Sequence, residues 1–142
     1  MSAVQRAVRP AMPWAEAVPR AARKRDEETL QRSVMQFLRL ALPADGVAFA
    51  IPNGGLRSPR EAARMKGMGV TAGVADLLVV FRGRAIFIEL KAKAGVMSAA
   101  QKEMTRRLVY AGAAVCLCRS VEEVEAQLRE ACVPLRASVS HG

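Results

Sequence analysis

Residues 76–91, DLLVVFRGRAIFIELK, decide the fold of this chain. Asp76 to Phe81 and Ala85 to Leu90 are rich in Val, Ile, Leu and Phe, which are residue types favoured in strands. Arg82-Gly83-Arg84 separates the two runs. Because two apolar runs joined by a short turn containing glycine are typical of a β-hairpin, the sequence predicts a hairpin here.

Three charged residues stand at the open end of this hairpin: Asp76, Glu89 and Lys91. Side chains alternate along a strand, so Glu89 and Lys91 project from the same face. A two-residue turn formed by Gly83 and one of its neighbours places Asp76 opposite either Glu89 or Lys91. In both registers the three side chains share one face, whereas a three-residue turn would shift the pairing and separate them.

Two neighbouring carboxylates repel each other, and a divalent cation offsets that repulsion. Mg²⁺ takes oxygen ligands from one or two carboxylates and fills its shell with water and substrate phosphate. The metal activates a bound water, and a lysine such as Lys91 can orient that water or stabilise charge on the phosphate. The pattern therefore indicates phosphodiester hydrolysis. The plainer interpretation is a turn residue at Asp76 and a surface ion pair between Glu89 and Lys91, since so short a pattern often occurs by chance.

The flanking sequence predicts alternating helices and strands. Apolar residues spaced by three and four favour a helix over 27–42, which Pro43 ends. Capping residues Ser58, Ser98 and Ser120 favour helices over 59–67, about 99–111 and about 121–131. Strands are predicted over 47–51 and 115–118. The order α-β-α-β-β-α-β-α predicts an α/β fold with a small mixed sheet flanked by helices.

Three further features are candidates for the site. Glu27 lies at the edge of the apolar stripe of the first helix, so its carboxylate can point toward the hairpin, whereas Glu28 points away. The amide of Gln101 can reach a phosphate or a metal-bound water, although its place in a capping box with Ser98 explains it equally well. The segment from Asn53 to Arg57 is either a phosphate-binding loop or a plain turn.

The chain has 142 residues and a formal net charge of +9, which is enough for one domain and favours a polyanionic partner such as nucleic acid. Residues 1–25 carry +5 of this charge and three prolines, so we predict a flexible basic arm over 1–25, a domain over 26–133 and a flexible tail over 134–142. Residues 57–93 contain eight basic and three acidic residues. The candidate DNA-binding residues are Asn53, Gly54, Arg57, Arg60, Lys66 and Lys93.

Other classes of protein are disfavoured. No apolar run approaches the roughly 18 residues of a spanning helix, and the N-terminus lacks the apolar stretch of a secretory signal, so we expect a soluble, intracellular protein with no membrane partner. Three cysteines and a single histidine, His141, argue against a disulfide framework and a structural zinc site. We also expect no nucleotide cofactor.

The motifs together resemble the VRR nuclease (VRR-NUC) family of the PD-(D/E)XK nuclease superfamily, from about Glu27 to Leu128. The matching segments are EETLQ at 27–31, PNGG at 52–55 with Arg57, KGMG at 66–69, GVAD at 73–76, FIELK at 87–91, Ser98 to Gln101, and Gly112. The family has a proline before the metal-binding aspartate, where this chain has Ala75, and often a histidine before the Pro-Asn-Gly turn, where Ala50 stands.

The resemblance implies a restriction-endonuclease-like core and a metal-dependent DNA endonuclease. By it, Asp76, Glu89, the Leu90 carbonyl and Glu27 bind Mg²⁺ or Mn²⁺, Lys91 serves the attacking water, and Gln101 supports the site. Stand-alone members resemble structure-selective enzymes for branched DNA, including homodimeric Holliday-junction resolvases, and are frequent in bacteriophages, so we expect the cytoplasm of a bacterium or a phage-infected cell. The alternatives are a nicking or flap endonuclease of the same fold, or a DNA-binding module without catalysis.

Overall fold

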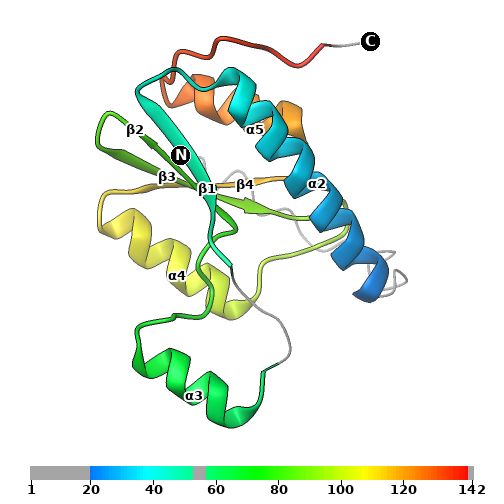
Figure 1. The fold of residues 1–142 in the computed structure, drawn as a ribbon, viewed down its shortest axis with the longest axis vertical. Coiled ribbons are helices and arrows are strands. Elements are labelled where there is room, and N and C mark those ends of the chain that lie inside the picture. Colours follow the sequence, from blue (N-terminus) through cyan, green and yellow to red (C-terminus); the bar gives the residue numbers. More distant parts are fainter. Residues whose placement is uncertain (1–19, 53–56, 141–142) are drawn as a thin grey trace.

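The computed structural model describes residues 20–52 and 57–140, which form four helices and four strands (Figure 1). The elements are α2 (Arg20–Ala41), β1 (Gly46–Ala50), α3 (Pro59–Gly67), β2 (Leu77–Phe81), β3 (Arg84–Leu90), α4 (Ala99–Tyr110), β4 (Ala114–Cys118) and α5 (Val121–Glu130). This is the predicted order of helices and strands.

The four strands form one sheet in the order β1-β2-β3-β4. The pairs β1–β2 and β2–β3 are antiparallel, and β3–β4 is parallel. The parallel pair needs a crossover connection, which α4 supplies. The predicted α/β fold with a small mixed sheet is therefore confirmed.

The register of the β2–β3 hairpin settles the choice that the sequence left open. Phe81 pairs with Arg84 and Leu77 with Ile88, so the turn consists of Arg82 and Gly83. Both turn residues have positive φ, 47° and 76°, as in the type I′ turn that suits the twist of paired strands. One step beyond the ladder, this register sets Asp76 opposite Glu89.

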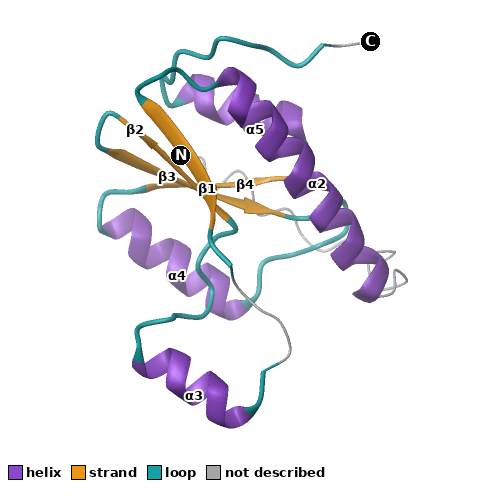
Figure 2. Ribbon diagram, in the orientation of Figure 1, coloured by secondary structure: helices purple, strands orange, loops and turns teal. Residues whose placement is uncertain are grey.

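The hydrophobic core lies between the sheet and the pair α2 and α5, which cover the same face (Figure 2). Alternate residues of β2 are buried on this side, and Leu38, Leu77, Ile88 and Leu128 are fully buried in it. Each such side chain contributes roughly 1.5–3 kcal/mol by burial. Helix α4 lies on the opposite face and buries only Thr105, and α3 buries no residue and stands away from the sheet. Packing therefore anchors α2 firmly and leaves α3 exposed.

The predicted arm and tail both differ from the structure. Helix α2 begins at Arg20, directly after the last of the three N-terminal prolines, so residues 20–25 are helical. The apolar pattern did not reveal this first part, because its sequence, RAARKR, contains no large apolar residue. At the other end, Arg136 N–H donates to the Ala41 carbonyl at 2.7 Å, Val139 N–H donates to the Glu125 carboxylate at 3.0 Å, and Leu135 packs against the core. Residues 134–140 are therefore packed rather than free, and residues 1–19 lie outside the described part.

Over residues 20–52 and 57–140, no helix has the length and apolar character needed to cross a membrane.

Candidate active site

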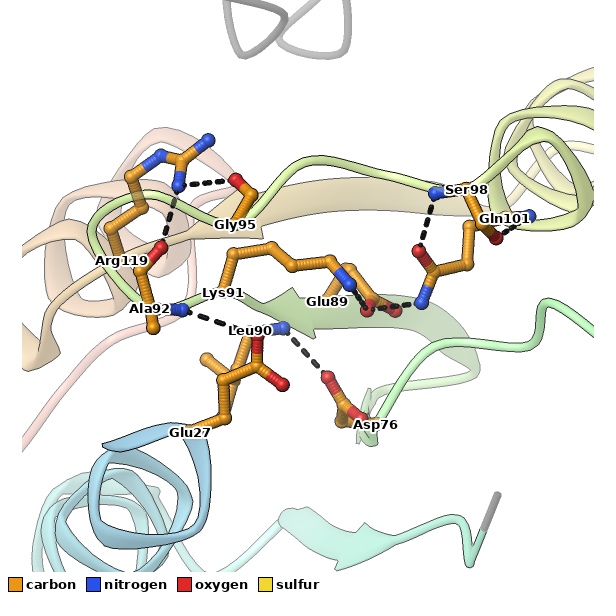
Figure 3. A network of polar contacts seen from close by, with 10 residues as sticks. All are labelled: Glu27, Asp76, Glu89, Leu90, Lys91, Ala92, Gly95, Ser98, Gln101 and Arg119. Atoms are coloured by element: carbon orange, nitrogen blue, oxygen red, sulfur yellow. Dashed lines mark hydrogen bonds and ion pairs between the residues drawn. The ribbon is translucent and has the colours of Figure 1, made fainter. Parts of the chain in front are cut away.

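The open end of the β2–β3 hairpin gathers Asp76, Glu89 and Lys91, as the sequence predicted (Figure 3). Asp76 Oδ2 accepts a hydrogen bond from the Leu90 N–H at 2.8 Å, and the Asp76 carbonyl accepts one from Ile51 N–H at 2.7 Å. Lys91 Nζ lies 3.5 Å from Glu89 Oε1. Backbone pairing on both sides of Asp76 therefore fixes the carboxyl beside the end of β3.

Burial decides between the two interpretations of these charges. The Glu89 side chain is 4% exposed and the Lys91 side chain 12% exposed. Surface ion pairs contribute little and stay hydrated, whereas a buried carboxyl carries a large desolvation cost. The interpretation as an exposed ion pair is therefore wrong for Glu89 and Lys91.

The electrostatics of the site show an excess of negative charge. Burial, reinforced by the neighbouring Asp76 carboxylate and only partly opposed by Lys91, raises the pKa of Glu89 to about 8. Burial also raises the pKa of Asp76, although the Leu90 N–H and Lys91 oppose this. One lysine would not compensate both carboxyls in their ionised forms, so a site like this favours an additional positive charge.

Glu27 reaches the site from α2. Its Oε1 accepts a hydrogen bond from Ala92 N–H at 3.4 Å, and its charge acts on Glu89. A Cβ atom at Gly95 would lie 3.2 Å from Glu27 Oε1 and 3.3 Å from Lys91 Cδ, so glycine leaves room for both side chains. Glu28 is exposed. The prediction that Glu27 points toward the hairpin is confirmed.

Gln101 connects α4 to the site through both ends of its amide. Its Oε1 accepts from Ser98 N–H at 2.8 Å, which completes the capping box, and its Nε2 donates to Glu89 Oε1 at 2.7 Å. The capping box is therefore confirmed, and the amide also contacts the Glu89 carboxylate, whereas its contact with a phosphate or a metal-bound water stays a prediction. Gly73, with φ 85°, brings the segment before Asp76 against α4, since a Cβ there would lie 2.3 Å from the Ala100 carbonyl oxygen.

Arg119 is a residue of this region that the sequence did not indicate. Its Nη1 donates to the carbonyls of Ala92 at 2.8 Å and Gly95 at 2.7 Å, with a longer contact of 3.5 Å to Lys93 (Figure 3). Arg119 therefore holds the loop that follows Lys91. This loop contains Ala92, whose N–H donates to Glu27. No local pattern could have revealed this role, because the partners lie more than 20 positions earlier in the chain.

The predicted DNA-binding residues are only partly placed. Asn53 and Gly54 lie outside the described residues, and Arg57 is half-buried. Arg60 and Lys66 are exposed on α3, and Lys93 is exposed in the loop after Lys91.

The basic surplus of residues 57–93 does not form one surface. Arg82 pairs with Asp45 at 2.7 Å, and Arg84 donates to the Ala131 carbonyl at 2.5 Å. Both arginines stand at the turn of the hairpin, whereas the carboxyls stand at its open end. The chain reversal therefore separates charges that are close in sequence.

A cleft of about 570 Å³ leads to Asp76. It is lined by one side of α2, by Ala50 at the end of β1 with the next two residues, and by Asp76 and Leu90. The cleft gives a solvent-borne ligand access to Asp76.

The carboxyl pair fits a divalent cation. Within residues 20–52 and 57–140, no cluster of three or more His, Cys, Asp or Glu is arranged to hold a metal ion. Mg²⁺ needs only one or two protein carboxylates, and Asp76 and Glu89 supply two whose mutual repulsion a cation would relieve. Glu27 is nearby but accepts the Ala92 N–H.

Comparisons with known proteins bear on the fold. No protein-family model and no curated protein matches the sequence. A solved structure described as "VRR_NUC domain protein" superposes with a TM-score of 0.62 at 24% identity, covering 74% of this chain and 86% of that one. Another, described as "VRR_NUC domain", has a TM-score of 0.48 at 25% identity and covers 74% and 95%. This chain therefore has the fold of a VRR_NUC domain protein.

Proposed function

We propose that this protein is a metal-dependent endonuclease that hydrolyses phosphodiester bonds in branched or structured DNA. The observation that carries the proposal is the pair formed by the buried Glu89 and the partly buried Asp76 beside Lys91, with Asp76 lining a cleft. Two neighbouring acids withdrawn from solvent are costly unless a function requires them, and strongly shifted pKa values concentrate at functional sites. A VRR_NUC fold is consistent with this chemistry.

The chain's own residues would divide the work as follows. Asp76 and Glu89 would hold Mg²⁺ or Mn²⁺, with the Leu90 carbonyl and Glu27 as the further ligands that the family resemblance implies. Such an ion, when bound, lowers the pKa of a water ligand and neutralises charge on phosphate. The Lys91 ammonium orients the attacking water and stabilises the negative charge that develops on the phosphate.

Gln101 and the Leu90 N–H position these groups. The 2.7 Å bond from Gln101 Nε2 fixes the rotamer of Glu89, and the 2.8 Å bond from Leu90 N–H fixes that of Asp76. Partners of this kind set the orientation of metal ligands. Preorganised carboxylates avoid the cost of rearrangement at the moment of reaction.

A homodimer is part of the proposal, since a four-way junction needs two symmetric cuts and one small domain offers a single site. Light scattering after size exclusion gives the mass of the particle in solution. A monomer that cleaves only one strand would favour a nicking or flap endonuclease instead.

The direct test of the proposed function is a cleavage assay. Labelled four-way junction, flap, nicked duplex and linear duplex are incubated with the protein in Mg²⁺, Mn²⁺ or EDTA, and the cut positions are mapped. We expect cleavage of branched substrates with either metal and none in EDTA. Absence of cleavage on every substrate in both metals would overturn the proposal, and DNA binding without cleavage would favour the non-catalytic module.

Arg119→Ala is expected to lower the cleavage rate by about 10–100-fold, which is the typical cost of losing a partner that orients metal ligands. The physical reason is that the loop from Ala92 to Gly95 loses its clamp, so Glu27 loses its backbone donor. Arg119→Lys should recover little, because one ammonium cannot reproduce the guanidinium's reach to two carbonyls.

The control for this prediction is Arg129→Ala, which removes an arginine bound to Glu125 on α5, away from the loop. Rates at saturating substrate and melting temperatures are compared. If Arg119→Ala and Arg129→Ala cleave at the same rate, Arg119 does not position the site.

A further inference from the structure

One wall of the cleft carries basic residues that the sequence did not group together. We propose that the side of α2 facing the cleft binds the phosphates of one unpaired DNA strand through Lys24, Arg32 and Arg39, here named the α2 basic row. All three residues line the cleft that also contains Asp76. This inference rests on the proposed function and names the form in which the substrate reaches the site.

The spacing of the row suits a nucleic-acid backbone. The three residues are separated by eight and seven positions, or about two turns each, so they fall on one side of the helix. At about 1.5 Å per residue the row extends roughly 22 Å. It therefore runs along the cleft and contacts a chain of phosphates rather than a single anion.

The charges of the row are not used by the fold. Lys24, Arg32 and Arg39 are exposed, and none has a hydrogen bond or ion pair to any residue in the described part of the chain. Five arginines elsewhere are engaged: Arg82 with Asp45, Arg84 with Ala131, Arg106 with Glu103, Arg119 with Ala92, and Arg129 with Glu125. The acids Glu27 and Glu28 lie on the same wall and offset two of the three charges, which leaves this side of α2 with a net charge of +1. A net positive wall that leads to a phosphodiesterase-like carboxyl pair is complementary to DNA.

The size of the cleft selects a single strand. About 570 Å³ lies within the range of roughly 300–1,000 Å³ that encloses a small ligand. A DNA duplex comprises both strands and a major groove about 12 Å wide between them, so even a short duplex segment has more volume than this cleft. One extended sugar-phosphate chain, separated from its complement, is narrow enough. Branched DNA supplies such strands.

The test compares two double variants that remove the same charge. Arg32→Ala with Arg39→Ala removes two members of the row. Arg107→Ala with Arg129→Ala removes two exposed arginines from the last turns of α4 and α5, outside the cleft. Binding to a short single strand and to a blunt duplex is measured in EDTA over a range of salt, and melting temperatures check the fold.

The row variant is expected to weaken single-strand binding by about tenfold and to reduce the salt slope by about 1.4, from about 0.7 per phosphate contact. The control variant and the duplex should show smaller changes. If the two double variants bind the single strand equally well, the α2 basic row does not bind DNA phosphates. If the row variant loses as much affinity for the duplex as for the single strand, the row does not select one unpaired strand. Because EDTA separates binding from cleavage, failure of the cleavage assay would refute the proposed activity without deciding this result.

Discussion

Asp76→Asn is expected to abolish metal-dependent DNA cleavage and to leave the fold intact. The side-chain oxygen of asparagine can still accept the Leu90 N–H bond, so the local structure persists. One of the negative charges that would hold the cation is lost, and Glu89 is the remaining member of the carboxyl pair. Loss of one group that stabilises a transition state costs about 10²–10³-fold in rate. For a metal ligand we expect at least the upper end of that range.

Asp45→Asn is the matched control for this variant. Asp45→Asn is the same substitution of an aspartate by asparagine, at the other end of the sheet. There the Asp45 carboxylate pairs with exposed Arg82, and that hydrogen bond lowers the pKa of Asp45. Cleavage of junction and flap substrates is measured in Mg²⁺ and Mn²⁺ for both variants, purified identically. Activity retained by Asp76→Asn at the level of Asp45→Asn would place the chemistry elsewhere.

The metal-free protein is expected to lose stability as the pH rises from about 5 to 8. Burial raises the pKa of Glu89 to about 8, whereas the same carboxyl in the unfolded chain has its ordinary pKa of 4.5. Between these two values the folded state holds a proton that the unfolded state has released. The contribution is therefore complete below pH 4.5 and is lost as the pH passes through 8. Each unit of pKa difference corresponds to about 1.4 kcal/mol, so the total is on the order of 3–5 kcal/mol.

Glu89→Gln tests this prediction, because glutamine is isosteric and does not ionise. In EDTA, urea unfolding of this variant should depend far less on pH between 5 and 8, and the variant should be more stable than the wild type above pH 8. Glu28→Gln, an exposed residue of α2, should retain the wild-type dependence. Added Mg²⁺ should stabilise the wild type most at high pH, since a ligand of the folded state stabilises it by mass action. A wild-type stability that is constant from pH 5 to 8 would contradict a buried, proton-holding Glu89.

Local sequence patterns predicted most helices and strands, because the residues that define each of these elements are close together in the sequence. The hairpin followed from two β-rich runs, and the helices α3, α4 and α5 followed from the caps Ser58, Ser98 and Ser120. The first turns of α2 were not predicted because their sequence has no large apolar residue. The packing of the tail after Pro134 was not predicted, because its partners, such as Ala41, are almost a hundred positions away.

In the candidate site, too, local patterns predicted one part of the geometry and the tertiary structure decided the other. Sequence alternation placed Glu89 and Lys91 on one face, but it allowed Asp76 two partners. The type I′ turn at Arg82 and Gly83 decided between them. That turn must match the twist of strands already held in a sheet, which is a property of the whole fold.

By itself the sequence determined the α/β order, the hairpin and the identity of the acids, since period and spacing encode contacts between near neighbours. The tertiary structure alone decided what surrounds those acids. It buried Glu89, turned Gln101 onto it, set Arg119 against the loop after Lys91, and aligned α2 along the cleft. Each of these contacts joins segments far apart in the chain, and their geometry depends on how α2, α4 and β4 pack against the sheet. Packing of this kind leaves no periodic signal in the residues that take part.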